Sequence, residues 1–236
     1  MNIVIIGATG GIGSALIDRF SSDTSNQVFA LGRRRPRIVR ENIDYLPIDF
    51  DEEPSLETAA RFCTAEAPVD VVVNTVGVLH GDGLYPEKSI REVSDTALGT
   101  YFHTNTICSA LALKHFLWTL PRQRRGVYAS LSARVGSIED NRLGGWYGYR
   151  ASKAAHNMLI KTVAIEFKRT HRHGLIIGIH PGTVDTKLSE PFTGDLPEER
   201  VFTPDYAARQ IMMLMERVRP EQSGEILAYD GTRIPG

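Results

Sequence analysis

Residues 2–17 of the sequence read NIVIIGATGGIGSALI, and this stretch decides the fold. Asn2 to Ile6 is a short apolar run, typical of a strand buried on both faces of a parallel sheet. Gly7, Gly11 and Gly13 follow it, and a helical pattern begins directly afterwards. This order is typical of a dinucleotide site, because glycines let the backbone approach a pyrophosphate and a helix N-terminus supplies N–H groups. The alternative is a glycine-rich turn that binds no ligand.

The rest of the chain alternates between strand and helix patterns. Short apolar runs predict further strands at 27–31, 43–48, 69–73, 127–131, 175–180 and 224–229. Helical periodicity predicts helices at 54–67, 94–120, 149–169 and 204–218. Because the connections are short, we expect an α/β fold, a doubly wound Rossmann fold with one mostly parallel seven-stranded sheet and helices on both faces. We see no repeat or linker, so residues 1–236 are expected to form a single dinucleotide-binding and catalytic domain.

The composition argues against several classes of protein. The 236 residues include 27 basic and 28 acidic side chains, and a formal net charge of −1 gives no general attraction to nucleic acid or to anionic membranes. Cys63 and Cys108 lie in apolar helical patterns and are expected to be buried thiols. No apolar run is long enough to span a membrane and no signal-peptide pattern precedes the first strand, so a cytoplasmic protein is expected. His171 and His173 have no carboxylate or cysteine at ligand spacing, so no metal is expected.

The predicted strand 27–31 ends in a basic run. In a Rossmann unit an acidic residue at this place binds the ribose 2′-hydroxyl, but here Gly32 is followed by Arg33 and Arg34. Guanidinium groups suit a phosphate monoester, so NADP(H) is expected in preference to NAD(H), with Arg33 the first candidate and Arg34 the second. The alternatives are a nucleic-acid patch or a solvated charge run, and the second is plausible for Arg35 and Arg37.

A phenol and an ammonium group lie four residues apart in Tyr149-Arg150-Ala151-Ser152-Lys153. Positions i and i+4 share one face of a helix, so both groups can reach the same small volume. A nearby cation favours the phenolate and lowers the pKa of a tyrosine, which would let Tyr149 exchange a proton near neutral pH. Most tyrosine–lysine pairs at this spacing lie on a helix surface without a catalytic role. The significance of this pair therefore depends on the other motifs in the chain.

Polar residues follow other predicted strands, at the sheet edge where ligands bind in open α/β folds. Asp49 ends the third strand at a position suited to an adenine amino group. Asn74 and Gly77 leave the fourth strand and would border the cofactor. Asn105 lies among apolar residues of the 94–120 pattern. It is either a polar surface position, or the site of a backbone kink or a water ligand near the site.

Taken in order, these signals resemble the short-chain dehydrogenase/reductase family along essentially the whole chain. The resemblance is carried by the Gly7-x-x-x-Gly11-x-Gly13 turn, Asn74-Thr75-Val76-Gly77, Asn105, the Ser132 region, Tyr149-x-x-x-Lys153, and Pro181-Gly182 with Thr186. Gly-Ser-Ile after the serine and Tyr-Arg-x-Ser-Lys at the tyrosine are similar to the bacterial C-factor and insect sniffer branch of carbonyl reductases.

The resemblance implies an oxidoreductase that transfers hydride between NADP(H) and a small carbonyl or alcohol compound. Tyr149 would be the general acid in ketone reduction, and Lys153 would bond the nicotinamide ribose and lower the pKa of the tyrosine. Ser132 would stabilise the developing charge on the substrate oxygen, and Asn105 would hold a water linked to Lys153. The resemblance also implies a homodimer or homotetramer formed through the helices that hold Asn105 and Tyr149.

The residues expected to contact the cofactor lie on the glycine turn, at the strand ends and on the Tyr149 helix. They are Gly7, Thr9, Gly10, Gly11, Ile12, Gly13, Arg33, Arg34, Asp49, Phe50, Asn74, Val76, Gly77, Tyr149, Lys153, Pro181, Gly182, Val184 and Thr186.

One departure from the family pattern affects a catalytic position. Counted from Gly126, the Ser-Ser pair of the family falls on Ser132-Ala133, and the residue that is usually catalytic is the second. Ser132 is the first candidate for the catalytic serine, and Ser130 and Ser137 are the alternatives. Ala133 also keeps a second hypothesis open, in which the chain is an NADP(H)-binding signalling or regulatory protein with little turnover.

Three loops would face the substrate, at 80–86, 137–147 and 187–202. Their large side chains are apolar or aromatic, so we expect an apolar or aromatic carbonyl compound; they are Leu84, Tyr85, Leu143, Trp146, Leu188 and Phe192. The 187–202 segment shows no clear period, and a segment of this length is often a lid or a binding loop.

Overall fold

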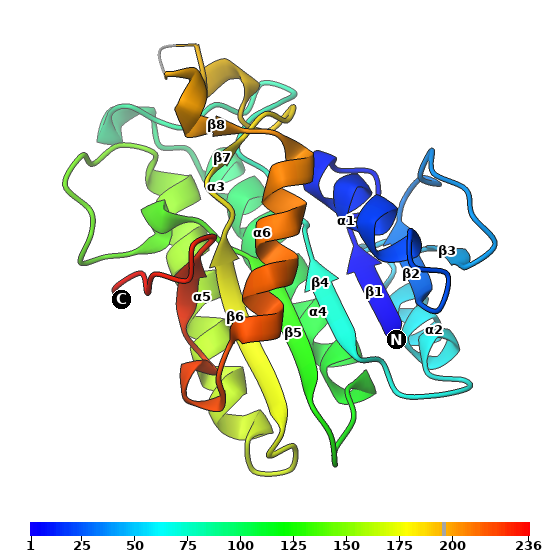
Figure 1. Cartoon of the computed structure of the whole chain (residues 1–236). Coiled ribbons are helices and arrows are strands. Elements are labelled where there is room, and N and C mark those ends of the chain that lie inside the picture. Colours follow the sequence, from blue (N-terminus) through cyan, green and yellow to red (C-terminus); the bar gives the residue numbers. More distant parts are fainter. Residues whose placement is uncertain (195–196) are drawn as a thin grey trace.

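The computed structural model describes residues 1–194 and 197–236, and a parallel sheet is its central element. Within these residues, the sheet contains β1 (Asn2–Ile6), β2 (Gln27–Gly32), β3 (Ile43–Pro47), β4 (Val71–Asn74), β5 (Gly126–Leu131), β6 (Gly174–His180) and β9 (Ile226–Ala228). The spatial order is β3-β2-β1-β4-β5-β6-β9, and every neighbouring pair is parallel (Figure 1). The direction of winding reverses between β1 and β4, which is the switch point where open α/β sheets bind ligands.

Helices cover both faces of this sheet, as Figure 1 shows. The α-helices are α1 (Gly11–Ser21), α2 (Glu53–Cys63), α3 (Asp95–Phe102), α4 (Cys108–Phe116), α5 (Tyr147–Phe167) and α6 (Pro204–Arg217). Short 3-10 helices are η1 (Ile90–Glu92), η3 (Leu117–Thr119), η4 (Arg134–Gly136), η5 (Glu190–Phe192), η6 (Glu198–Arg200) and η7 (Pro220–Gln222). A small parallel ladder that the sequence patterns did not predict joins β7 (Thr183–Val184) to β8 (Val201–Phe202).

The core consists of two apolar layers, one on each face of the sheet. Alternate strand residues face opposite sides, so Val4 and Ile6 pack with α2, α4 and α5. Ile3 and Ile5 pack on the other side with α1 and α6. This burial on both faces is why the strands appear in the sequence as continuous apolar runs, and the predicted doubly wound Rossmann fold is confirmed.

The predicted single helix 94–120 is wrong in one respect. It is divided into α3 and α4 by η2 (His103–Ile107), a π-helical segment. The π segment is only one turn long and is flanked by α-helices whose apolar residues recur at the usual spacing, so the sequence pattern does not reveal the shift of its hydrogen bonds. The buried residue of this segment is Asn105, which excludes the surface position that the sequence left open and supports the backbone kink.

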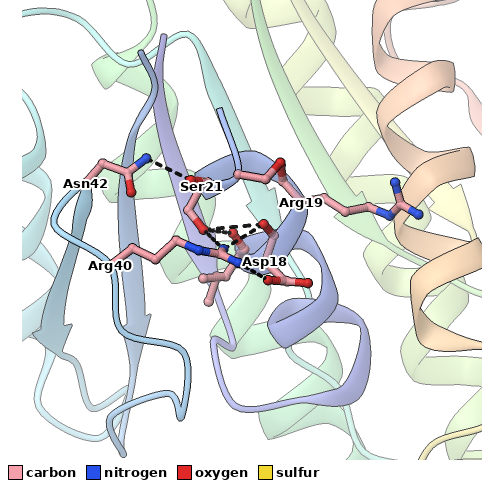
Figure 2. Close-up of polar contacts among 7 residues, drawn as sticks. Asp18, Arg19, Ser21, Arg40 and Asn42 are labelled. Atoms are coloured by element: carbon pink, nitrogen blue, oxygen red, sulfur yellow. Dashed lines mark hydrogen bonds and ion pairs between the residues drawn. The ribbon is translucent and has the colours of Figure 1, made fainter. Parts of the chain in front are cut away.

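The basic loop after β2 is fixed against α1, as Figure 2 shows. The guanidinium group of Arg40 pairs with the Asp18 carboxylate at 2.6 Å and also donates to the Ser21 hydroxyl and, at 2.9 Å, to the Asp18 carbonyl. Asn42 donates to the Ser21 carbonyl at 3.1 Å. These bonds hold the end of the segment that contains Arg33 and Arg34.

Across residues 1–194 and 197–236, no helix is long and apolar enough to cross a membrane.

One titratable side chain lies inside the core without a partner. His156, on α5, is fully buried, and among the residues that the structure describes neither of its ring nitrogens has a hydrogen-bond partner. Burial lowers the pKa of His156 to about 3, and the neighbouring charge of Lys153 acts in the same direction. The folded protein therefore keeps this imidazole neutral, whereas the unfolded chain protonates it near its ordinary pKa of about 6.5. Folding stability is thus lost as the pH falls from about 6.5 towards 3.

We expect His156→Leu to flatten this acid dependence. The variant removes the titration, so the fall in unfolding free energy between pH 7 and pH 4 should shrink by about 3 kcal/mol. Urea unfolding of both proteins at several pH values measures the difference. The solvent-exposed His173→Leu is the matched control and should follow the wild type. Parallel pH curves for wild type and His156→Leu would contradict the prediction.

Candidate active site

A cavity of about 700 Å³ opens at the carboxyl ends of β1, β4, β5 and β6. Most of the predicted site residues line it: Thr9, Gly10, Gly11, Ile12, Gly13, Val76, Gly77, Ser132, Tyr149, Lys153, Pro181, Gly182, Val184 and Thr186. The other predicted residues do not line it, and these are Gly7, Arg33, Arg34, Asp49, Phe50, Asn74 and Asn105. In the part of the chain that the structure describes, no cluster of His, Cys, Asp or Glu could hold a metal ion.

A second hollow, of about 780 Å³, lies between α2 and α4 at the opposite end of the sheet. None of the predicted site residues lines it. Its charged side chains are largely neutralised by ion pairs, such as those of Lys114 with Glu53 and of Arg61 with Glu57. The predicted catalytic and cofactor-binding residues are therefore associated with the first cavity and not with this hollow.

The glycine turn fits a dinucleotide. Gly7 has a φ of +90°, and its backbone N–H donates to the Leu31 carbonyl at 2.9 Å. A Cβ atom at Gly13 would lie 2.3 Å from the Gly7 carbonyl oxygen, so only glycine allows this close approach. Gly10 precedes the first turn of α1 and has no side chain to cap it, which leaves N–H groups and the positive end of the helix for an anion.

The candidate 2′-phosphate residues stand at the same edge. Arg33 and Arg34 follow Gly32, the last residue of β2, and both side chains are exposed. Asp49 is exposed and Phe50 is half-buried, directly after β3. These four residues lie after the carboxyl ends of β2 and β3 and outside the set that lines the cavity.

The β4 turn is held by its own polar side chains. Asn74 is fully buried, and its Oδ1 accepts from the Val76 backbone N–H at 3.1 Å. The Thr75 hydroxyl donates to the Ile6 carbonyl at 2.8 Å and so ties β4 to β1 below the glycine turn. Asn74 therefore shapes the wall that Val76 and Gly77 present to the cavity. The role of Thr75 was not predicted, because a threonine after a strand is a common residue in any turn.

Asn105 connects the β4 turn to α5. Its Oδ1 accepts from the Val78 N–H at 2.9 Å, and its Nδ2 donates to the Val78 carbonyl at 3.0 Å. The same Nδ2 donates to the Ser152 hydroxyl at 3.1 Å. The π-helical turn brings this amide inward, so one side chain fixes both the 77–79 loop and the helix that carries Tyr149.

Tyr149 and Lys153 both lie buried on the cavity side of α5, as their spacing predicted. Lys153 Nζ donates to the Leu131 carbonyl at 3.1 Å, and burial lowers the pKa of Lys153 to about 8. Burial, aided by the neighbouring Tyr101, raises the pKa of the Tyr149 phenol well above its ordinary value. Desolvation of the phenol therefore opposes the lowering of the pKa that was expected from Lys153.

The candidate serines have separate partners. Ser132 lines the cavity, but its hydroxyl donates to Asn157 Oδ1 on α5 at 2.5 Å. Ser137 donates to the Gly236 carbonyl at 3.2 Å, and Ser130 is buried within β5. Asn157 was missed by the sequence reasoning, although it lies four residues after Lys153 and therefore on the same helix face.

The start of α5 is fixed by a residue that no sequence signal indicated. Glu87 is buried, its carbonyl accepts from the Trp146 N–H at 2.5 Å, and its Oε2 accepts from the Gly148 N–H at 3.1 Å. Trp146 has a φ of +53° and adopts the left-handed conformation at this helix start. The acidic side chain thus caps the N-terminus of α5, one residue before Tyr149.

Aromatic side chains cover the cavity. The ring centroids of Trp146 and Phe192 are 5.0 Å apart, and those of His80 and Phe192 are 5.6 Å apart. The His80 ring lies 2.7 Å from the Lys187 carbonyl oxygen. The three predicted substrate loops meet here, apart from residues 195–196 of the 187–202 loop, which lie outside the described residues.

Known proteins share this sequence and this architecture. A family model described as short chain dehydrogenase matches residues 1–196. The C-signal protein of Myxococcus xanthus is 32% identical over 181 residues, which cover 75% of this chain and 97% of that protein. The carbonyl reductase sniffer of D. melanogaster superposes with a TM-score of 0.85 at 22% identity, covering 100% of both chains. The NADPH-bound carbonyl reductase from chicken fatty liver has a TM-score of 0.84 at 21% identity, covering 99% and 93% of the two chains.

The two structural neighbours establish the fold, and the family model together with C-signal establishes kinship in sequence. The predicted resemblance to the short-chain dehydrogenase/reductase family is confirmed; C-signal is a relative in sequence, and sniffer shares the fold. The chain belongs to the short chain dehydrogenase family and is an oxidoreductase of that family.

Proposed function

We propose that the protein is an NADPH-dependent carbonyl reductase, with Tyr149 as the proton donor. The observation that carries the proposal is that Tyr149 and Lys153 are buried on one face of α5 in the cavity that also contains the α1 N-terminus. One place in the molecule thus combines a phenol, an ammonium group and a glycine turn shaped for a pyrophosphate.

When bound, the reduced nicotinamide supplies hydride to the carbonyl carbon. Burial raises the pKa of Tyr149, so the phenol is protonated before the reaction, and it donates this proton to the carbonyl oxygen. Lys153 would bind the nicotinamide ribose through the hydrogens that Leu131 does not use. Asn105 holds α5 and the 77–79 loop in register and would border the water that returns a proton to Lys153.

The remaining contacts follow from position. Gly7, Thr9 to Gly13, Val76, Gly77 and the 181–186 turn would surround the diphosphate and nicotinamide, and Asn74 would hold the turn beneath them. Asp49 and Phe50 would flank the adenine. Arg33, with Arg34 beside it, would bind a 2′-phosphate, which is why NADP(H) is preferred in this proposal. The predicted bond from Ser132 to the substrate would require its hydroxyl to leave Asn157.

The substrate is proposed to be an apolar or aromatic carbonyl compound. Leu79, Leu84, Tyr101, Ala133 and Tyr149 form one buried apolar cluster at the cavity, and Trp146 and Phe192 pack against it. Such walls favour an apolar substrate body, because its transfer from water into the cavity is favourable.

A second candidate function is an NADP(H)-binding signalling or regulatory protein with little turnover. Two observations favour it: Ala133 stands where the family has its usual serine, and C-signal of M. xanthus is 32% identical. Tight NADPH binding without turnover on a broad carbonyl panel would support this second function.

A homodimer or homotetramer through the outer surfaces of η2 and α5 is also proposed. Ile107, Met158 and Ile165 are exposed there, with 49%, 66% and 56% of their surfaces accessible. Contacts between copies of the chain would remove these side chains from water, which stabilises an assembly.

Tyr149→Phe is expected to lower kcat by about 10²- to 10⁴-fold, because it removes the proton donor and keeps the ring. NADPH oxidation is measured against a panel of ketones, aldehydes and quinones. The dissociation constant for NADPH, from fluorescence titration, should change little and shows that the variant is folded. Equal rates for the two proteins on every reduced substrate would sink the assigned mechanism.

Arg33→Asp is expected to lower the ratio of NADPH to NADH affinity by about tenfold or more, because a charge-assisted bond is lost and a repelling carboxylate takes its place. Both dissociation constants are measured for each protein. Arg37→Asp, an exposed change in the same loop, is the matched control and should leave the ratio near that of the wild type. An unchanged ratio in Arg33→Asp would show that Arg33 does not read the 2′-phosphate.

A further inference from the structure

The hydroxyl of Ser132 is bonded to the body of α5, although the residue lines the cavity. It donates to Asn157 Oδ1 at 2.5 Å, and Asn157 lies two turns after Tyr149 on α5. The backbone here continues the sheet, because the Ser132 N–H donates to the Ile179 carbonyl at 2.8 Å. Side chains alternate along such an extended segment, so Ser132 shares the sheet face of Tyr128 and packs towards the body of α5.

The next residue supplies the wall beside the phenol. Ala133 lines the cavity and belongs to the same buried apolar cluster as Tyr149 and Tyr101. The segment that follows is pressed tightly against α5, since a Cβ atom at Gly136 would lie 2.9 Å from Lys153 Cβ. This contact and the Ser132–Asn157 bond fix residues 132–136 from both ends, so Ala133 is held in place at the cavity.

Of the other two candidate serines, one has hydrogen-bond partners elsewhere and one is buried within β5. Ser137 Oγ donates to the Gly236 carbonyl and accepts from the Asp140 N–H at 3.0 Å. Ser130 lies two residues before Ser132, so it faces the same side of the sheet and is buried there. Neither hydroxyl is placed beside the phenol of Tyr149.

We infer that Ala133 determines which carbonyl compounds react, because the reaction centre lacks the hydroxyl that would share the developing negative charge with Tyr149, and that electron-poor carbonyl compounds are therefore the substrates. The inference rests on the proposed function and specifies its substrate class. One preorganised donor to a developing oxyanion contributes about 10²- to 10³-fold in rate. Without it, the substrate itself must lower the barrier, through substituents that withdraw electrons from the carbonyl carbon.

The bond changes are those of a carbonyl reduction. The carbonyl carbon gains hydride from the reduced nicotinamide and is reduced, and the oxygen gains the proton of Tyr149, so the alcohol and the oxidised nicotinamide are the products. Ser132 takes no part in this step and fastens β5 to α5 through Asn157.

The test uses the full chain with NADPH and a series of para-substituted acetophenones, from methoxy to nitro. The wild type should reduce the nitro compound best, with a steep dependence of kcat/KM on substituent. Ala133→Ser should raise kcat/KM for unsubstituted acetophenone by about tenfold or more and flatten that dependence. Ala133→Cys introduces a side chain that is similar in size to serine but only a weak hydrogen-bond donor. It controls for the change in side-chain volume and should produce no such rise in kcat/KM.

Ser132→Ala provides an independent test of the inference. The inference expects a loss of no more than about threefold in kcat/KM together with a fall in Tm, because Asn157 loses its donor while the Lys153–Leu131 bond still holds α5 against β5. A hundredfold loss of kcat/KM in Ser132→Ala overturns the inference. So does an Ala133→Ser protein that is folded, as judged by its Tm, but reduces acetophenone no faster than the wild type. In both cases Tyr149-dependent turnover would still support the proposed function. Absence of Tyr149-dependent turnover in wild type and in Ala133→Ser overturns the proposed function and the inference with it.

Discussion

Side-chain hydrogen bonds hold α5 against the carboxyl ends of β4 and β5, and the geometry of the whole site depends on them. Lys153 reaches the Leu131 carbonyl and Ser132 reaches Asn157, so β5 is fastened to the helix from both sides. Thr106 donates to the Ser152 carbonyl at 2.9 Å. These directional bonds add to the close packing of the core and fix the height of the phenol above the sheet.

The π-helical turn is the local irregularity that makes this fastening possible. A regular helix over 94–120 would continue its α-helical bonding through Asn105. The wider turn instead places the Asn105 amide where it bonds both backbone groups of Val78 and the Ser152 hydroxyl. A fully buried amide is stable only when its donors and acceptors are paired, and these bonds provide the pairing. Such single-turn interruptions occur frequently at functional sites.

Sequence reasoning located the fold and the paired residues because both depend on simple periods. Strands buried on both faces produce continuous apolar runs, and a four-residue spacing brings Tyr149 and Lys153 to one helix face. The sequence was less informative where a shift of one residue along the chain changes the direction of a side chain. The direction of Ser132 depends on its place in an extended segment, the π turn leaves the apolar pattern intact, and Glu87 caps α5 from a loop 61 residues away in sequence.

The hydrogen bonds and charges around Lys153 indicate which ligand groups would complete the site. Its ammonium group has three hydrogens, and the structure satisfies one of them through Leu131. Burial without a carboxylate partner lowers the pKa of Lys153 to about 8, which means that its positive charge is poorly stabilised. A ribose diol offers neutral hydroxyl acceptors that would pair the remaining hydrogens and restore the charge. On the proposed function, a restored charge beside Tyr149 would draw the pKa of the phenol down from the value that burial imposes, so cofactor binding would itself complete the proton donor.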